Sequence, residues 1–210
     1  MKLSEIFYSI QGESTFAGLP CIFIRFSGCN LSCSYCDTKY AYEQNFELSV
    51  EKILDKIKKY SPVKLVEITG GEPLLQKEIY SLFEKLHSKN YQILLETNGA
   101  IFVNKIPKYV KKIMDIKTPT SKMSDKMKWE NLNFLTENDE IKFVLSDKND
   151  FDWAIKKIRK YDLQKYKILF SPNKSKLNEK SLAEWILKTK MPIRLQMQLH
   201  KIIWKNKKGV

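Results

Sequence analysis

Residues 27–38 read Ser27-Gly28-Cys29-Asn30-Leu31-Ser32-Cys33-Ser34-Tyr35-Cys36-Asp37-Thr38 and carry three of the chain's four cysteines. They directly follow residues 20–27, an apolar run with the length of a β-strand. The C-x3-C-x2-C spacing lets three thiolates reach three corners of an iron–sulfur cube and leaves the fourth iron without a protein ligand. A zinc knuckle is the alternative, but zinc needs a fourth ligand. Cys21 lies inside the apolar run, where we expect a buried, structural thiol.

The overall composition is that of a soluble globular protein. The chain has 210 residues, of which 43% are hydrophobic and 29% charged, so it is long enough to form a real core. No apolar stretch approaches the ~18 residues that cross a membrane. Residues 1–10 show no basic segment followed by a long apolar run, and the clustered cysteines do not suit long-range disulfides. We therefore expect a cytoplasmic protein with reduced cysteines and no membrane partner.

The charge balance is strongly basic. There are 37 Lys and Arg residues against 24 Asp and Glu, which gives a formal net charge of +13. All the basic residues except Arg25, Arg159 and Arg194 are lysines, scattered among acidic residues along the whole chain. Nucleic-acid-binding surfaces favour arginine and basic patches interleaved with aromatic residues. We expect a solvated lysine surface with no direct nucleic-acid partner; a metal-bearing nucleic-acid-binding module is the alternative from a different class.

Apolar runs of strand length recur along the chain. They are nearly continuous rather than alternating, which is typical of strands buried on both faces of a parallel sheet. The runs occupy residues 20–27, 63–69, 91–97, 110–116, 140–146, 166–171 and 193–199. Helical stripes lie between them, the first of them behind Ser49 as the expected N-cap. The stripes occupy residues 50–57, 79–86, 151–158 and 182–187.

This alternation of strands and helices predicts an α/β fold. Strand starts from residue 63 onward are about 20 to 30 residues apart, the length of one βα unit. The interval between residues 91 and 110 is too short for a full crossover helix. Because six or seven units cannot close an eight-stranded barrel, we predict one domain over residues 1–210, a partial parallel β/α barrel with some truncated crossover helices. Residues 117–138 are polar and lysine-rich, and we expect an insertion or a lid there.

A second motif, Thr69-Gly70-Gly71-Glu72-Pro73, lies at the end of a predicted strand. Two glycines let the backbone approach a ligand closely, and the carbonyls with the Glu72 carboxylate offer acceptors for an ammonium group. Together with the cysteine loop, in which an aromatic residue precedes the last cysteine, this motif resembles the signatures of radical S-adenosylmethionine (SAM) enzymes. The resemblance implies a 4Fe-4S cluster held by Cys29, Cys33 and Cys36, whose open iron binds the amino and carboxyl groups of SAM.

Further segments resemble one branch of that superfamily, the 7-carboxy-7-deazaguanine synthase family of queuosine and preQ0 (7-deazapurine) biosynthesis. These segments are residues 9–14, 18–20, 23–31, 35–38, 96–99, 115–121 and 199–201. The resemblance implies a carbon–nitrogen lyase that converts 6-carboxy-5,6,7,8-tetrahydropterin to 7-carboxy-7-deazaguanine with loss of ammonia, using the cluster, SAM and Mg2+. It also implies that a 5'-deoxyadenosyl radical abstracts a substrate hydrogen, the ring contracts and SAM is regenerated.

The resemblance assigns the site residues, and no side chain is catalytic in it because the radical forms on SAM. The hydroxyl of Thr38 is the implied protein ligand of Mg2+, an ion that often keeps its waters and takes few protein ligands. The implied substrate contacts are Ile10, Gln11, Gly12, Glu13, Arg25, Thr69 and His200. The implied SAM contacts are Tyr35, Asp37, Gly71, Glu72, Lys117, Thr118, Pro119, Ser121, Phe170, Ser171, Pro172 and Asn173.

Two of these substrate contacts carry structural expectations of their own. Arg25 stands alone in an apolar run, which is costly unless the guanidinium has a partner. His200 is expected to end the last strand, inside a C-terminal segment, residues 193–210, that completes the substrate site. The tail, residues 205–210, is expected to be a mobile end.

Partners and alternatives follow from the same resemblance. Family members are homodimers, and an acidic flavodoxin-type electron donor would suit the basic surface. Another small radical SAM enzyme, such as a glycyl-radical activase, is the alternative within the superfamily, although it should lack the Gln-Gly-Glu segment at residues 11–13 and the Asp-Thr pair after Cys36. Two positions depart from the family's usual residues: Ser14 stands where Gly is usual, and Tyr35 where Trp is common.

Overall fold

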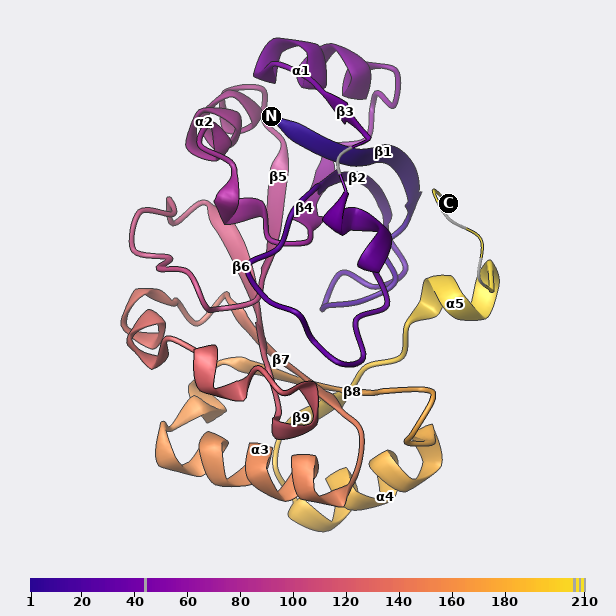
Figure 1. Cartoon of the computed structure of the whole chain (residues 1–210), viewed down its shortest axis with the longest axis vertical. Coiled ribbons are helices and arrows are strands. Elements are labelled where there is room, and N and C mark those ends of the chain that lie inside the picture. Colours follow the sequence, from indigo (N-terminus) through magenta and orange to yellow (C-terminus); the bar gives the residue numbers. More distant parts are fainter. Residues whose placement is uncertain (44, 206, 208, 210) are drawn as a thin grey trace.

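The computed structural model describes residues 1–43, 45–205, 207 and 209, and it is built on one nine-stranded sheet of order β3-β1-β2-β4-β5-β6-β7-β8-β9 (Figure 1). The strands are β1 (Lys2–Ile10), β2 (Pro20–Phe26), β3 (Phe46–Glu47), β4 (Leu65–Gly70), β5 (Gln92–Thr97), β6 (Val110–Ile116), β7 (Glu140–Leu145), β8 (Lys167–Pro172) and β9 (Ile193–Leu195). From β2 to β9 all neighbours are parallel, whereas β1 is antiparallel to β2 and β3. Within the described residues β3 and β9 do not pair, so the sheet stays open, and the predicted partial barrel is confirmed.

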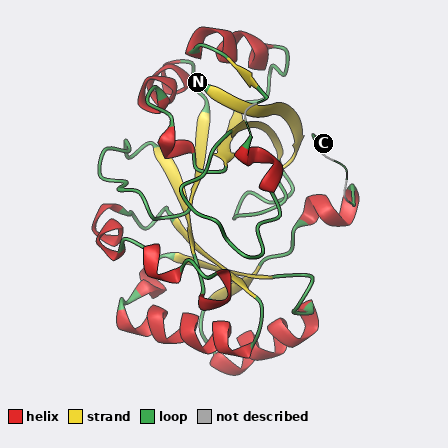
Figure 2. Cartoon of the chain, in the orientation of Figure 1, coloured by secondary structure: helices red, strands yellow, loops and turns green. Residues whose placement is uncertain are grey.

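Helices cover the outer face of the sheet (Figure 2). In Figure 1, α1 (Val50–Lys58) and α2 (Ile79–Ser88) lie at one end of the molecule, and α3 (Lys148–Lys160) and α4 (Glu179–Thr189) lie at the other. The short α5 (Leu199–Ile203) lies apart from them, near the C-terminus. The predicted N-cap of α1 is confirmed, because the Ser49 hydroxyl accepts a hydrogen bond from the Lys52 backbone N–H at 3.3 Å.

The helices pack on the sheet through the predicted apolar stripes. The buried members are Val50, Ile53, Leu54 and Ile57 of α1, Ile79, Leu82, Phe83 and Leu86 of α2, Phe151, Ala154, Ile155 and Ile158 of α3, and Leu182 and Ile186 of α4. They form one core with the sheet side chains that face them. The prediction is wrong for one residue of the fourth stripe. Leu187 is 76% exposed, because it lies on the solvent side of α4 beside the buried Ile186.

Two elements differ from the apolar runs of the sequence. The sequence of β1 contains no continuous apolar run, because β1 lies near the edge of the sheet and much of its length is only half-buried. The strand predicted through residue 199 is wrong beyond Leu195, where the chain leaves β8 and turns toward residues 11–14. The Gln196 side chain then bonds Ser14 and Glu13, and the helix that follows contains His200.

No helix connects β5 to β6 in the described chain, which confirms the predicted truncated crossover. Residues 117–138 fill the space instead. Asn131 is fully buried and donates to the carbonyls of Gly99 and Ile101 at 3.0 and 2.8 Å, while the Trp129 ring stacks on Tyr161 at the end of α3. These contacts join the segment to the loop after β5 and to the end of α3.

The concave face of the sheet changes character along its strands. Successive side chains of a strand alternate between faces, so residues two apart share a face. Toward the amino ends, concave side chains form a small apolar core of Cys21, Phe23, Leu65, Leu94 and Ile113, and the expected burial of Cys21 is confirmed. Two residues further along three of these strands the concave position carries a charge, at Glu67, Glu96 and Asp115. The concave face is therefore apolar at the amino ends of β2, β4 and β5 and charged two residues further along β4, β5 and β6.

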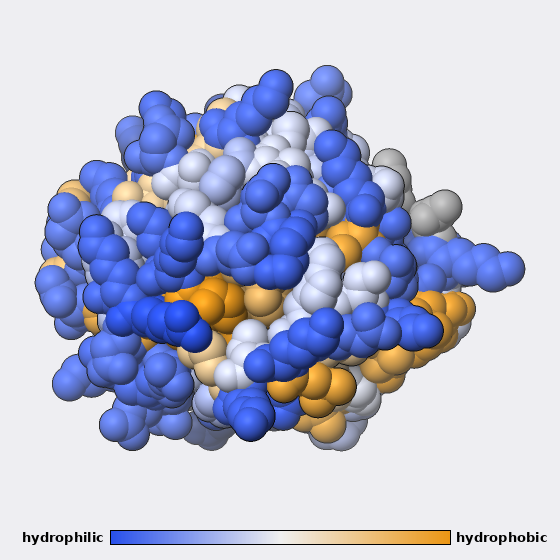
Figure 3. Space-filling view, turned by 90° about the horizontal axis from the view of Figure 1, so that it is seen from below, coloured by the Kyte–Doolittle hydropathy of each residue, from blue (hydrophilic) through white to orange (hydrophobic). Residues whose placement is uncertain are grey.

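The outer surface agrees with the lysine-rich composition. The face seen in Figure 3 is mostly hydrophilic, with separate smaller apolar areas. No helix in the described part of the chain is long and apolar enough to cross a membrane.

Candidate active site

A cavity of about 800 Å³ opens at the carboxyl ends of the parallel strands, where barrel and open-sheet enzymes place their sites. The predicted site residues that line it are Ile10, Gln11, Glu13, Arg25, Cys29, Cys33, Tyr35, Cys36, Asp37, Thr38, Thr69, Gly71, Lys117, Ser171, Pro172, Asn173 and His200. The predicted residues that do not line it are Gly12, Glu72, Thr118, Pro119, Ser121 and Phe170. The fold thus brings together most of a residue set that is spread over the whole sequence.

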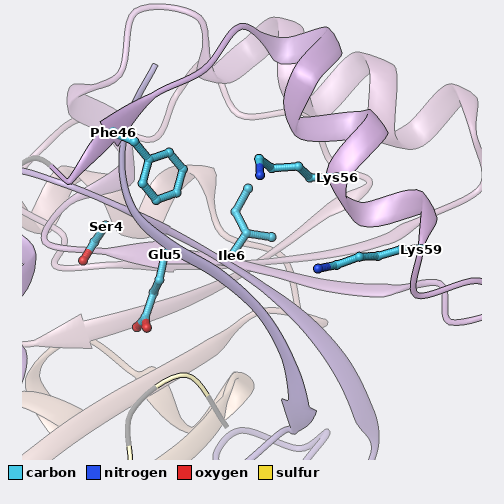
Figure 4. Close-up of a pocket in the computed structure, with 6 residues that line it drawn as sticks. All are labelled: Ser4, Glu5, Ile6, Phe46, Lys56 and Lys59. Carbon is cyan, nitrogen blue, oxygen red and sulfur yellow. The ribbon is translucent and has the colours of Figure 1, made fainter.

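A second cavity, of about 300 Å³, lies between the amino-terminal strands and α1. Figure 4 shows Lys56 of α1 and Lys59, directly after α1, on the same side of the cavity, and Phe46, Ile6, Ser4 and Glu5 complete its lining. Glu5 lines both cavities, but no cysteine and no predicted site residue lines the smaller one. We therefore place the candidate site in the larger cavity.

The cysteine loop starts from a glycine at the end of β2. Gly28 has φ 87°, a left-handed conformation that favours glycine, and its N–H donates to the Ala41 carbonyl at 2.8 Å. The thiols of Cys29, Cys33 and Cys36 are free, half-buried and directed to the same cavity. The Leu31 N–H lies 3.4 Å from the Cys29 sulfur, a donor that can stabilise a thiolate there.

The loop is tied to the end of β6. Ser34 donates from its backbone N–H to the Ser121 carbonyl and from its hydroxyl to the Thr120 carbonyl, at 3.1 and 2.7 Å. The Tyr35 hydroxyl lies 3.2 Å from the Thr118 hydroxyl and from the Val144 carbonyl. Thr118 and Ser121 are fully buried, so they hold the loop in place from behind the cavity wall.

The three thiols fit an iron–sulfur cluster rather than a disulfide. Burial raises the pKa of Cys29 and of Cys33, although the Lys117 ammonium opposes this shift. Metal ligation requires thiolates, so binding of a cluster would release these protons. Among the described residues, no three His, Cys, Asp or Glu side chains are placed to hold a single metal ion. The three loop thiols face one roomy cavity and would together hold a larger polynuclear group such as an iron–sulfur cluster.

The Gly-Gly-Glu-Pro turn lies directly against the cysteine loop. A Cβ on Gly70 would clash with the Phe26 backbone, and one on Gly71 would clash with the Gly28 carbonyl. The Glu72 N–H donates to that same carbonyl at 2.8 Å. These glycines are therefore needed for close approach of two protein segments, in addition to the approach of a ligand that the sequence predicts.

The Glu72 side chain, which the sequence predicts as an acceptor for the SAM ammonium group, is engaged by donors of the protein. It is fully buried and accepts hydrogen bonds from the Leu74 N–H, the Thr97 hydroxyl and the Asn98 N–H, at 3.2, 3.0 and 2.7 Å. Burial raises the pKa of Glu72 to about 7, against these donors. Glu72 thus fixes the loops after β4 and β5, and the carbonyls of the turn remain as acceptors at the cavity.

The Gln-Gly-Glu segment after β1 is held by the C-terminal part of the chain. The Leu199 N–H donates to the Gly12 carbonyl at 2.9 Å, and a Cβ on Gly12 would clash with the His200 ring. The Gln198 amide donates to the Glu13 carboxylate at 2.7 Å. His200 lines the cavity from α5 rather than from the expected strand end, and burial lowers its pKa.

Asp37 and Thr38 form a polar edge of the cavity. The Thr38 hydroxyl donates to Asp37 Oδ1 at 2.9 Å, and the Lys201 ammonium lies 2.7 Å from Asp37 Oδ2. Burial alone would raise the pKa of Asp37, but Lys201 and these hydrogen bonds hold it well below its usual range. Thr38 and an ionised carboxylate therefore offer neighbouring hard oxygens, which suit Mg2+.

The end of β8 contributes the remaining predicted SAM contacts. The Ser171 hydroxyl donates to the Gln196 carbonyl at 3.1 Å, and the Asn173 amide donates to the Ser146 hydroxyl at 3.1 Å. Both residues line the cavity, whereas Phe170 points to the opposite face and is buried against Phe143 and Phe151. The alternation of the strand thus separates Phe170 from its neighbours.

Sequence reasoning missed a group of charged residues on the cavity floor. Lys142 lies 2.6 Å from Glu13 Oε2, 2.9 Å from Glu96 Oε1 and 3.9 Å from Asp115 Oδ2. Asp115 also pairs with Lys117 at 2.9 Å. The available signal is a single charge inside an apolar run, as in Leu94-Leu95-Glu96 or Ile141-Lys142-Phe143.

Arg25 has the partner that its apolar surroundings demand. Its Nε lies 2.7 Å from Glu5 Oε1, and both side chains are about four-fifths buried. The Tyr40 hydroxyl donates to the same carboxylate oxygen at 2.9 Å. The described ion pair engages Nε, and the guanidinium still lines the cavity, where it can meet a second anion.

The chain is similar to known proteins in sequence and in fold. The radical SAM superfamily model matches residues 23–184. A 7-carboxy-7-deazaguanine synthase of Koribacter versatilis is 39% identical to the chain over 97% of both sequences, and one of Chlorobaculum tepidum is 40% identical over 97% of this chain and 94% of that protein. The crystal structure of QueE from Escherichia coli superposes with a TM-score of 0.75 over 93% of each chain, at 23% identity.

Proposed function

Because the chain belongs to the radical SAM superfamily and, within it, to the 7-carboxy-7-deazaguanine synthases, we propose that it converts 6-carboxy-5,6,7,8-tetrahydropterin to 7-carboxy-7-deazaguanine with loss of ammonia. The family membership makes it a lyase of 7-deazapurine biosynthesis that uses SAM and a 4Fe-4S cluster. It also disfavours the glycyl-radical activase and the nucleic-acid-binding module. One observation carries the specific reaction: Gln11, Glu13 and His200, all outside the superfamily match, line the cavity of the three thiols.

Each part of the cavity has a role in this proposal. The thiols of Cys29, Cys33 and Cys36 hold the cluster, and the backbone carbonyls at Gly70 and Gly71 face the amino group of SAM. When bound, the cluster and SAM supply the one-electron chemistry that starts the reaction. The side chains at the ends of β6 and β8, with Tyr35, surround the rest of the cofactor and keep bulk water from it.

The substrate's carboxylate and ring are held by the amino-terminal strands. Arg25 binds the carboxylate, which a guanidinium recognises through two parallel N–H groups. Gln11, Glu13, Thr69 and His200 surround the ring. The Lys142 ammonium donates to Glu13 Oε2 and the Gln198 amide donates to Glu13 Oε1, so the Glu13 carboxylate is fixed before the substrate binds.

The whole described chain serves this one site, which supports a single domain over residues 1–210. Within the C-terminal segment, residues 193–210, Lys205, Lys207 and Gly209 line the cavity and supply part of its wall. The other residues of the expected mobile end, at positions 206, 208 and 210, lie outside the described residues. A homodimer and an acidic flavodoxin-type electron donor remain part of the proposal. An ionic-strength series of the reduction rate tests the donor, since exposed charges are screened beyond about 8 Å at physiological salt.

The proposed reaction is tested by anaerobic reconstitution and turnover. The protein is expected to bind about four irons and four sulfides and, with SAM, Mg2+ and a reductant, to release ammonia and 7-carboxy-7-deazaguanine, identified by mass spectrometry. Assays without SAM and without the pterin are the controls. A loaded cluster that cleaves SAM but leaves the pterin unchanged would reject the reaction while keeping the superfamily, and zinc bound in place of iron would reject both.

The Mg2+ site is tested by Thr38→Ala, with Ser32→Ala on the same loop as the matched control. Loss of the Thr38 hydroxyl is expected to remove most of the stimulation by Mg2+, because it removes the protein's hard oxygen ligand. Iron content and the visible spectrum of the cluster should stay unchanged. An unaltered Mg2+ dependence of turnover in Thr38→Ala would remove this residue from the site.

A further inference from the structure

Glu67 is a buried carboxyl in the cavity that none of the sequence motifs includes. It lies on β4, two residues before Thr69, and points to the concave side of the sheet. Its side chain lines the main cavity, although only 5% of the residue is exposed. A carboxyl group placed so deeply is costly unless hydrogen-bond donors or cations compensate it.

The protein compensates this carboxyl only in part. The Gln11 amide donates to Glu67 Oε2, and Gln11 Oε1 accepts from the Glu13 N–H at 3.1 Å, so the amide is held in one orientation. No other hydrogen bond reaches the Glu67 carboxyl from the described residues. Lys142, the nearby ammonium, is engaged by Glu13 and Glu96.

The environment of Glu67 disfavours the ionised form of its carboxyl group. Burial and the neighbouring Glu96 carboxylate raise the pKa of Glu67 well above its usual range. Four charged side chains interact electrostatically with Glu67. They are Glu13 after β1, Arg25 of β2, Glu96 of β5 and Lys142 of β7. A ligand that brings N–H groups would favour the ionised carboxylate and complete its hydrogen bonds.

An aromatic wall stands beside this carboxyl. Phe23 is the neighbour of Glu67 across the β2–β4 pair, and its ring stacks on Phe7 with centroids 4.8 Å apart and planes 7° apart. Both rings line the cavity, and the Arg25 guanidinium lies 5.9 Å from the centre of the Phe7 ring. The cavity therefore offers a flat apolar wall between one cation and one carboxyl.

We propose that Glu67 binds the 2-amino and N3–H edge of the substrate's pyrimidinone ring, a specificity determinant in addition to the residues assigned above. This inference rests on the proposed function, because it takes a carboxylated pterin as the ligand. Two adjacent ring N–H donors match the two oxygens of a carboxylate, as the substrate's own carboxylate matches Arg25 at the other end. A ring that lacks the 2-amino group leaves the buried carboxyl unpaired, which is how such sites reject close analogues.

The test compares two stable ligands in the reconstituted enzyme with SAM and without reductant. They are 6-carboxypterin, which carries the 2-amino group, and 6-carboxylumazine, which carries an oxygen there. Wild-type protein is expected to bind the pterin about 10- to 100-fold more tightly, and Glu67→Gln to reduce that ratio to about threefold or less, because the amide cannot accept two N–H groups. Equilibrium binding is followed by ligand fluorescence under anaerobic conditions.

Glu140→Gln is the matched control. Glu140 is a fully buried carboxylate on the same face of the sheet, paired with Lys111 at 2.7 Å and outside the cavity. The ratio of its affinities for 6-carboxypterin and 6-carboxylumazine should equal the wild-type ratio, whatever the substitution does to thermal stability. If Glu67→Gln does not fold, the ratio measured in wild type still decides, because the proposal requires discrimination there.

The outcomes separate this inference from the proposed function. Equal binding of the two ligands to wild-type protein, or an unchanged ratio in Glu67→Gln, would overturn the role of Glu67 even if the enzyme turns over its substrate. Failure of wild type to bind 6-carboxypterin and to convert the tetrahydropterin would instead overturn the proposed function.

Discussion

The two faces of the sheet are built from the same strands and have opposite chemistry. On β4, Val66 and Ile68 point to the helices and are fully buried among apolar side chains, whereas Leu65, Glu67 and Thr69 point to the concave side. The helix-covered face is mainly apolar, although Lys112 of β6 is buried there and pairs with Asp139 at 3.0 Å. The concave face is apolar at the amino ends of β2, β4 and β5, and its charged side chains gather where the cavity opens, apart from the Lys111–Glu140 ion pair outside the cavity.

The energetic consequences of the two faces differ as well. Each fully buried aliphatic side chain on the helix side contributes roughly 1.5–3 kcal/mol of transfer free energy. On the concave side, Lys142 and its carboxylate partners lose hydration, and their attraction offsets that loss only while all partners are present. The first face therefore stabilises the fold, and the second is organised for a ligand at some cost in stability.

The largest difference between two variants is expected for the thiols of Cys29, which lines the cavity, and Cys21, which lies in the apolar part of the concave face. Cys29→Ala should abolish cluster binding and turnover, because three thiolates are needed to hold the cluster. Cys21→Ala should keep a full iron content and reduce the free energy of unfolding by only about 1 kcal/mol. Iron and sulfide analysis with thermal unfolding measures both. Loss of the cluster from Cys21→Ala would break the distinction between the two thiols.

The second prediction compares a charged residue on the concave face, Lys142, with an apolar residue on the helix-covered face, Ile68. Lys142→Met should reduce the free energy of unfolding by about 3 kcal/mol, because Glu13 and Glu96 lose their shared ammonium group inside the protein. It should also raise the KM for the pterin, since the Glu13 carboxylate loses its ion-pair partner and is held only by the amides of Gln196 and Gln198.

Ile68→Val on the helix side of β4 is the control for this variant. It should cost about 1 kcal/mol and leave KM unchanged. Denaturant unfolding and steady-state kinetics on both variants make the comparison. A Lys142→Met protein with a normal KM would show that the charged floor has no influence on substrate binding.

The smallest effect is expected at the exposed edge of the cavity, where Lys201 pairs with Asp37. Lys201→Ala should change the free energy of unfolding by about 0.5 kcal/mol or less, since exposed ion pairs are weak and screened by salt. Because the pKa of Asp37 is lowered in the folded protein, the pair stabilises at neutral pH and its contribution begins to fade below about pH 4. Thermal unfolding in low and high salt measures this, and an effect independent of salt would contradict it.

Local sequence patterns determined much of this protein. The spacing of Cys29, Cys33 and Cys36, the Ser49 cap, the strand runs and the stripes of α1 to α3 each depend on residues close together in the chain. Local backbone geometry and the 3.6-residue period of a helix express such patterns directly. They sufficed for the partial barrel and for most of the residues that line the cavity.

Tertiary structure alone decided where distant segments meet. It turned the expected strand end at His200 into a helix that packs on Gly12, and it brought the Glu72 carboxylate to donors in the loop after β5. It also gathered Glu67, Glu96 and Lys142 from three strands into one charged floor. A single charge in an apolar run has no visible partner in the sequence, because its partner is set by the register of parallel strands, which the folded sheet alone determines.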